Sequence, residues 1–558
     1  MKEKLTPWQR FMGLLELERK DILQIFYYAI FSGLVGLSLP LGIQAIIGLI
    51  QGAQVSTSWI ILVLLVTLGV IFSGALQLMQ LRIIETLQQR IFMKASFEFS
   101  YRFPKIKMKE LQNYYPPELA NRFFDTLTIQ KGLSKILIDV PSALLQIVFA
   151  LLLLSFYHPF FIFFGFLLLL LIYFVFKFTA VKGLETSLEE SKNKYKVAHW
   201  IQEVARTIVS FKVSGNTKLS LKKNDALVSK YLQSREGHFK ILVLQFIHLI
   251  SFKVIVTAGL LLIGGMLVLN QEMNIGQFVA AEIIILLVIG SVEKLILGLE
   301  SLYDILTSIE KIGQVVDKEL ESQGGEKPVV KDCLTLELDN LSYEVPSREA
   351  PILKDINLSI KQTDRILVQG ESGSGKTTLL HLISGVILPT KGDIYVNNLS
   401  IKSLQLNYYR SNIGVFLNTE SPFEGTIREN VSFDSRVSDE VILDAFEKVK
   451  LLDFLKKQPK GLQTVLYPEG QQMPTTVAKK IVLARAIIKQ PKLLILEDSL
   501  AEFSKKETVE IMEFLTSPKN PWALIIVSGN DSWKAKCNKH ITLEEGQIKL
   551  EENVKHNK

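Results

Sequence analysis

No aspartate, glutamate, lysine or arginine occurs between Asp21 and Arg82. About 20 consecutive apolar residues suffice for one helix across a bilayer, so this stretch predicts two membrane-spanning helices, near 22–49 and 57–81. The polar segment 51–57 between them contains a glycine, as expected of a short connector. A content of 48% hydrophobic residues also favours an integral membrane protein.

Two further charge-poor regions predict four more spans. The region 140–176 is interrupted by the turn-forming sequence 155–159, which divides it into two spans. The last pair is less clean, because spans near 243–269 and 276–299 carry charged residues. Together these regions predict a membrane domain of six helices.

The distribution of basic residues predicts the orientation of these helices. The long segments 82–139 and 177–240 are rich in lysine and arginine, whereas the three short connectors contain neither. By the positive-inside rule the long segments and both termini are cytoplasmic. The expected location is therefore the inner (cytoplasmic) membrane.

The first residues, 1–20, place Trp8 and Phe11 among charged residues, which predicts an amphipathic helix on the inner membrane surface. A signal peptide is disfavoured because the apolar run from Ile22 is too long and lacks a small-residue cleavage site.

Charged residues within the last two predicted spans are candidates for functional or structural pairing. Counted from the outer connector, Lys253 and Glu293 lie at similar depth, so they are predicted to approach each other or to reach toward the inner surface. Glu282 lies about 10 Å below the outer end at 1.5 Å per residue. For Glu282, a role in a substrate path or in proton coupling competes with packing or an interfacial position.

The composition changes after the sixth predicted span. Residues 311–332 are polar and include a glycine pair and a proline, which predicts a linker that follows a membrane domain at 21–310. From 333 to 558 strand patterns alternate with helix patterns, as in an α/β domain with a largely parallel sheet.

This α/β domain contains a phosphate-loop sequence with the flanks that the motif requires. The apolar residues 366–368 predict a buried strand before the loop, and 378–383 predict a helix after it. Backbone N–H groups and the helix N-terminus form an anion cradle, Lys376 reaches the outer phosphates, and Thr377 can ligate magnesium. The predicted fold class is an α-helical six-span membrane domain plus an α/β P-loop NTPase nucleotide-binding domain. The predicted phosphate-binding residues are Gly370, Glu371, Ser372, Gly373, Ser374, Gly375, Lys376, Thr377 and Thr378.

Charge and cysteine content argue against other classes of protein. A formal net charge of +7, from 63 basic and 56 acidic residues, is modest for this length and gives no reason to expect binding to nucleic acid. Cys333 and Cys537 are far apart and lack zinc-site spacing. A disulfide framework is therefore not expected, and a reducing compartment fits.

Further segments of the α/β domain are similar to one known family. Residues 336–343 and 351–358 resemble its first two strands, 423–430 the segment after its Q-loop, 481–486 its signature helix, and 493–496 its Walker B strand. With six spans in front, the chain resembles a half-transporter of the ATP-binding-cassette (ABC) exporters, with a type I exporter-like membrane domain. The resemblance implies ATP and magnesium as cofactors. It also implies a homodimer, or a heterodimer with a second ABC half-transporter, in which each ATP lies between the phosphate loop of one half and the signature segment of the other.

The signature segment departs from the family pattern. Where the family has Leu-Ser-Gly-Gly-Gln, this chain has the sequence MPTTV at 473–477. Thr475 and Thr476 place side chains where glycines let backbone N–H groups approach the γ-phosphate, and Pro474 removes one donor. The helix that follows is expected to form, since proline is tolerated in a first turn.

The catalytic strand departs as well. The family's Asp-Glu pair is reversed to Glu497-Asp498, which implies Glu497 beside magnesium and Asp498 as the general base. Each carboxylate is displaced by a methylene, so magnesium is expected to be tolerated and hydrolysis to be slow. The switch histidine is replaced by Gly529. The nucleotide-binding domain is therefore expected to be degenerate.

Two nucleotide contacts also differ. Asn418 replaces the Q-loop glutamine, with the same amide on a shorter chain, and Val345 replaces the aromatic residue that stacks on adenine. Tyr343 lies two residues earlier on the same strand face, where core packing is the expected role.

Two functions remain open from the sequence, since a third class, a kinase or other phosphate-loop enzyme, would leave the six spans and the cassette-specific segments unexplained. One is ATP-dependent export as one half of a dimeric transporter with slow or impaired hydrolysis. The other is a nucleotide-binding but catalytically inactive subunit that regulates or supports an export complex. The family also implies coupling helices near 116–124 and 211–221, and a periplasmic adaptor is a further partner that the sequence leaves open. The cargo is not determined.

Overall fold

The chain folds into two compact units. Residues 1–106 and 113–319 form a helical unit, and residues 107–112 and 320–558 form an α/β unit. Of the first connector, predicted at 51–57, residues 52–56 lie outside the described residues. The computed structural model describes residues 5–51, 57–328, 334–346, 348–498 and 500–553.

Among the described residues, six segments of the helical unit are long and apolar enough to cross a membrane, by length and composition. Each predicted span falls within one of them, so the prediction of a six-span helical domain is confirmed. The segments are Arg19–Gln51, Thr57–Lys105, Pro116–Ser155, Phe160–Arg206, Leu219–Leu269 and Ile275–Val316.

These segments are built from long helices joined by short turns. One turn of π-helix, Leu260–Gly264, interrupts the fifth segment. The helices are α1 Pro7–Leu17, α2 Arg19–Gly36, α3 Ser38–Gln51, α4 Thr57–Arg102, α6 Pro116–Asn121, α7 Asp125–Ser155, α8 Phe160–Arg206, α9 Ile208–Val213, α10 Leu219–Gly259, α11 Gly265–Leu269 and α12 Ile275–Val316, with 3-10 turns at Phe103–Lys105 and Arg122–Phe124.

The first membrane segment breaks between α2 and α3 for a local reason. Pro40 has no N–H to donate to the carbonyl of Gly36, and its ring would clash with that carbonyl in a continuous helix. The α-helix therefore stops at Gly36 and starts again at Ser38.

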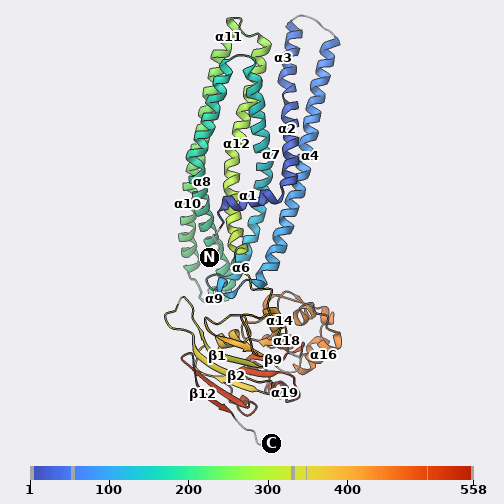
Figure 1. Cartoon of the computed structure of the whole chain (residues 1–558), viewed down its shortest axis with the longest axis vertical. Coiled ribbons are helices and arrows are strands. Elements are labelled where there is room, and N and C mark those ends of the chain that lie inside the picture. The colour runs from blue at the N-terminus through green and yellow to red at the C-terminus, as the bar shows by residue number, and fades with distance from the viewer. Residues whose placement is uncertain (1–4, 52–56, 329–333, 347, 499, 554–558) are drawn as a thin grey trace. The chain divides into compact units, whose positions relative to one another are not determined.

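α1 lies across the long helices rather than along them (Figure 1) and packs on α12. Thr6 caps it, because the Thr6 hydroxyl accepts a hydrogen bond from the N–H of Gln9 while the Gln9 side chain accepts one from the N–H of Thr6. Phe11 is buried, whereas Trp8 and Met12 are exposed. The predicted helix within 1–20 is present and has one exposed apolar face.

α12 is the most buried helix of this unit and continues past the predicted end of the membrane domain at 310. Val315 is fully buried, and this packing holds residues 311–316 in the helix. The linker predicted at 311–332 therefore begins later than expected.

The charged pair predicted in the last two spans is confirmed. Nζ of Lys253 on α10 lies 2.6 Å from Oε2 of Glu293 on α12. Glu282 is half-buried on α12, and its predicted role stays a prediction.

The α/β unit is organised around a six-stranded sheet with the order β12-β11-β3-β10-β9-β6. Five strands are parallel, and β12 runs antiparallel to β11. This result confirms the predicted α/β domain with a largely parallel sheet. The strands are β3 Arg365–Gln369, β6 Ile413–Phe416, β9 Leu493–Glu497, β10 Ala523–Val527, β11 Lys539–Glu544 and β12 Gln547–Asn553.

A second, antiparallel sheet has the order β2-β1-β4-β5 and shares a buried core with β3 and α13. The helical part of the unit forms another core around α18. The remaining elements are β1 Leu336–Tyr343, β2 Leu353–Ile360, β4 Lys391–Val396, β5 Leu399–Ser400, β7 Gly425–Thr426, β8 Val465–Leu466, α5 Met108–Leu111, α13 Lys376–Ile383, α14 Leu406–Ser411, α15 Ile427–Ser432, α16 Asp439–Lys448, α17 Leu452–Lys456, α18 Thr475–Ile487 and α19 Lys505–Thr516, and the 3-10 turns Gly461–Gln463, Pro468–Gly470, Leu500–Glu502 and Asp531–Trp533.

Candidate nucleotide-binding site

The carboxyl ends of three neighbouring parallel strands position the predicted site residues. Val527 of β10 lies opposite Val368 of β3 and opposite Glu497 of β9. Ligands of open α/β sheets bind at this edge. The sheet order thus brings the phosphate loop after β3 and the carboxylates after β9 to the two sides of β10.

The phosphate loop has the backbone that its glycines predict. Gly370, Gly373 and Gly375 have φ of 150°, 87° and 99°, a region that side chains rarely adopt. At Gly370 a Cβ would meet the carbonyl oxygen of Leu543 at 2.1 Å. The loop can therefore keep this shape only with glycine there. Helix α13 starts directly after it, at Lys376.

The Lys376 ammonium is held over the loop by two of its carbonyls. Nζ donates to the oxygens of Gly370, at 2.8 Å, and Glu371, at 2.6 Å. Glu371, Ser372 and Gly373 are exposed, whereas Ser374 is buried. The loop thus presents backbone N–H groups, an ammonium and a helix N-terminus together, which is the donor set that a polyphosphate requires.

Thr377 and Glu497 meet although one follows the loop and the other ends β9. Oγ1 of Thr377 donates to Oε1 of Glu497 at 2.9 Å, and the N–H of Asn418 donates to Oε2 at 3.1 Å. A hydroxyl beside a carboxylate is an oxygen pair that suits magnesium. The residues present therefore fit the metal that the sequence predicts, with Glu497 rather than Asp498 facing the loop.

Asp498 makes different contacts. Its Oδ2 accepts hydrogen bonds from Oγ of Ser528, at 2.5 Å, and from the indole nitrogen of Trp533, at 2.9 Å. Its Oδ1 accepts from the N–H of Leu500 at 2.8 Å. Both carboxylate oxygens are therefore engaged with protein donors.

Sequence reasoning missed Ser528 and Trp533 as partners of this carboxylate. Both follow β10 and are buried. A buried tryptophan needs an acceptor for its indole N–H, so an acceptor was to be expected. Its identity depends on the order of the strands, which the local pattern does not give.

The Asn418 side chain is exposed, and the contact of this residue with Glu497 is made by the backbone N–H of Asn418.

Two residues later, burial raises the pKa of Glu420 to about 7, while the charge of Arg485 acts in the opposite direction. The Arg485 guanidinium donates to the backbone oxygen of Asn430 at 2.7 Å and lies against the rings of Phe423 and Phe433.

The residues beside the predicted adenine position differ in burial. Val345 is half-buried and packs against the core of the first strands. Tyr343 is 8% exposed, and its hydroxyl accepts a hydrogen bond from Nε2 of Gln112 at 2.8 Å. Tyr343 is therefore a core residue, as predicted.

Residues 107–112, which include α5, belong to the α/β unit, whereas the predicted coupling segment at 116–124 lies in the helical unit.

The signature segment leads into an intact helix. Pro474 is the N-cap of α18, which starts at Thr475, so the expected helix is present. Thr475 is exposed and Thr476 is half-buried. Farther along α18, Nζ of Lys480 contacts Oε1 of Glu507 on α19.

Comparisons with known proteins decide the family. A family model described as "ABC transporter transmembrane region" matches residues 22–292, and one described as "ABC transporter" matches residues 353–501. The chain belongs to the ABC transporters. It combines one transmembrane region with one ATP-binding region, which is the organisation of an ABC half-transporter.

Two relatives and one solved structure are similar to this chain. This ABC transporter is 26% identical over 304 residues to an "ATP-dependent lipid A-core flippase" of Burkholderia orbicola (54% of this chain, 50% of the relative). It is 25% identical over 378 residues to a "Putative export ATP-binding/permease protein" of Rickettsia bellii (66% of this chain, 64% of the relative). The matches thus span half to just under two thirds of these relatives. A solved structure described as "a bacterial Atm1-family ABC exporter with ATP bound" aligns with a TM-score of 0.85 and 14% identity, covering 96% of this chain and 95% of that chain, which shows a shared fold.

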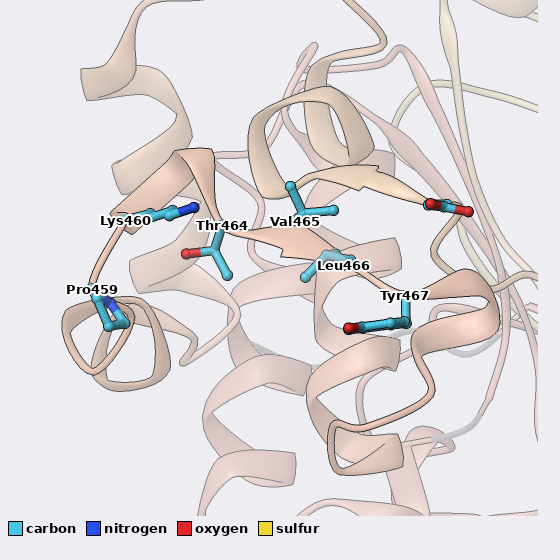
Figure 2. Close-up of a pocket in the computed structure, with 7 residues that line it drawn as sticks. Pro459, Lys460, Thr464, Val465, Leu466 and Tyr467 are labelled. Carbon is cyan, nitrogen blue, oxygen red and sulfur yellow. The ribbon is translucent and has the colours of Figure 1, made fainter.

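The ATP-binding region of this ABC transporter also contains a cavity of about 420 Å³ at β8 (Figure 2). None of the nucleotide-site residues named above lines it. Its lining residues are Glu424, Pro459, Lys460, Thr464, Val465, Leu466 and Tyr467.

Proposed function

We propose that this protein is an ATP-dependent exporter that works as one half of a dimeric transporter and hydrolyses ATP slowly. The phosphate loop and the Thr377–Glu497 pair support ATP binding with magnesium. The observation that carries slow hydrolysis is the Asp498 carboxylate, whose two oxygens accept three hydrogen bonds from protein donors.

When bound, ATP would supply the energy for transport, and magnesium would neutralise part of the charge of its phosphates. Residues 370–378 hold the phosphates through backbone N–H groups, Lys376 counters their charge, and Thr377 with Glu497 holds the metal. ATP binding draws the two nucleotide-binding domains together, and slow hydrolysis resets them.

Slow hydrolysis is expected whichever partner completes the dimer. In a homodimer each composite site combines a good phosphate loop with an engaged Asp498, a glycine at the switch position and the signature segment 473–477. In a heterodimer with a normal half, one site contains the altered catalytic strand and the other contains the altered signature. Neither pairing yields a fully equipped site.

We place the protein in the inner (cytoplasmic) membrane, with the ATP-binding domain in the cytoplasm, because basic residues gather in the long segments between spans. The largely uncharged spans fit an apolar or amphipathic cargo. A periplasmic adaptor is a further partner for such an exporter.

The test uses the full-length protein in lipid nanodiscs. ATP binding and ATP hydrolysis are measured beside a half-transporter with the usual catalytic residues and beside the Lys376→Ala variant. We expect magnesium-dependent ATP binding that Lys376→Ala abolishes, and hydrolysis at least about tenfold slower than in the reference. Absence of binding at millimolar ATP, or hydrolysis as fast as in the reference and lost in Lys376→Ala, overturns the proposal.

The same engagement of Asp498 also favours a second candidate function, a nucleotide-binding subunit that regulates or supports an export complex without hydrolysis. Lys376→Ala separates the two. Loss of transport with this variant supports the exporter, whereas full transport in cells that carry it supports the second function.

A further inference from the structure

Hydrogen bonds to the carboxylate of Asp498, the residue after Glu497, connect the end of β9 with the segment that follows β10. The carboxylate of Asp498 is bonded by Ser528, Trp533 and the N–H of Leu500, and the N–H of Asp498 donates to the carbonyl of Val527 at 2.9 Å. We call Asp498, Ser528 and Trp533 the clasp.

The donors of the clasp are fixed in place by packing. Trp533 is 0% exposed and belongs to the hydrophobic core around α18. Ser528 is 6% exposed and directly follows β10, while Leu500 is 2% exposed in the same core. A carboxylate held by three fixed donors has one preferred orientation.

That orientation bears on the general-base role that the position of Asp498 predicts. In hydrolysis, oxygen of water bonds to the γ-phosphorus, the bond to the bridging oxygen breaks and ADP leaves, while a base takes the proton of the water. A base must lie within hydrogen-bond reach of that water. The Glu497 carboxylate accepts a hydrogen bond from Thr377, and the Asp498 carboxylate accepts hydrogen bonds from Ser528 and Trp533.

We infer that Ser528 and Trp533 are positioning residues that hold the Asp498 carboxylate away from the attacking water and so set the slow rate of hydrolysis. This inference rests on the proposed function, since it explains how ATP is bound but slowly cleaved. It assigns the slow rate to the clasp rather than to the loss of a carboxylate.

The experiment is a double variant, Ser528→Ala with Trp533→Phe, in the full-length protein in nanodiscs. It removes two of the three donors and keeps an aromatic ring in the core. We expect kcat for ATP to rise about tenfold with KM changed less than twofold, because general-base catalysis contributes about 10² or more. Adding Asp498→Asn to the double variant is expected to abolish the gain.

A matched control removes another buried indole donor of the same unit. Trp522 is 2% exposed, and its indole nitrogen donates to the carbonyl of Leu515 at 3.0 Å. Trp522→Phe loses one such bond without touching Asp498, so its kcat should equal that of the wild type. Thermal unfolding shows that each variant is folded.

Any of three results overturns the inference and leaves the proposed function standing. The first is a folded double variant that binds ATP and has the wild-type kcat. The second is a gain in kcat that survives Asp498→Asn, and the third is a gain that Trp522→Phe reproduces. Fast hydrolysis by the wild type overturns the proposed function instead.

Discussion

Oγ1 of Thr377 lies 2.9 Å from Oε1 of Glu497, across 120 positions of sequence. This bond joins the first turn of α13 to the end of β9, at the point where the phosphate loop meets the sheet. It places the longer of the two reversed carboxylates beside the hydroxyl that can ligate magnesium.

Glu497→Gln is expected to weaken ATP binding at least about tenfold in the presence of magnesium, because it removes the negative charge beside Thr377. Binding of ATP in EDTA should change much less. A fluorescent ATP analogue titrated into the full-length protein measures both. Glu513→Gln, at an exposed surface pair with Lys536, is the control. Equal loss with and without magnesium would contradict a metal role for Glu497.

Glu420 is expected to make the α/β unit less stable as pH rises. Burial raises its pKa from 4.5 to about 7 in the folded state. Its stabilising contribution is therefore complete below pH 4.5 and is lost as pH rises through 7, by up to about 3 kcal/mol. Glu420→Gln should remove this part of the pH dependence, measured by thermal unfolding between pH 5 and 8. Exposed Glu424→Gln serves as the control, and parallel curves for Glu420→Gln and the wild type refute the assignment.

Arg10 is expected to hold α1 on the end of α12. Its Nη1 lies 2.7 Å from Oδ1 of Asp317, Nη2 contacts Oδ2, and a Cβ at Gly313 would meet Nη1 at 2.6 Å. Arg10→Gln should lower the free energy of local unfolding of α1 by about 1.5 kcal/mol and raise its rate of hydrogen exchange about tenfold. Mass spectrometry of exchange in residues 7–17 measures this effect. Exposed Arg19→Gln is the control, and unchanged exchange in Arg10→Gln would show that other contacts hold α1.

Lys253 and Glu293 are expected to be coupled in stability. Removal of one partner leaves a charge without its counter-ion in an apolar segment, whereas removal of both does not. Lys253→Met and Glu293→Gln should each lower the free energy of unfolding, measured by thermal unfolding in nanodiscs. The double variant should lose about 1–3 kcal/mol less than the sum of the two single changes. The control is Lys294→Met, which changes an exposed residue next to Glu293 on α12. Strict additivity of the two changes would exclude a coupled pair.

Much of the architecture could be read from local patterns. The charge-free stretch between Asp21 and Arg82 requires membrane helices, because each charge in a bilayer is costly. The glycines before Lys376 require a loop between β3 and α13, because they adopt φ values that other residues rarely do. Even the Lys253–Glu293 pair could be predicted, since helix rise converts sequence distance into depth.

Local patterns were less informative about where a helix ends when the burial of a residue decides its end. The linker was expected to start at 311, yet α12 continues to Val316 because Val315 is buried in the helical unit. The bond between Arg10 and Asp317 joins residues 307 positions apart, and the pattern near either residue does not indicate the other.

The sequence by itself determined that two carboxylates stand side by side at the end of a buried strand, and the family resemblance implied a different role for each. Only the tertiary structure decided which protein groups each carboxylate contacts. Successive side chains of a strand point to opposite faces of a sheet. What each carboxylate meets therefore depends on what packs there, which is Thr377 of α13 for Glu497 and Ser528 and Trp533 after β10 for Asp498.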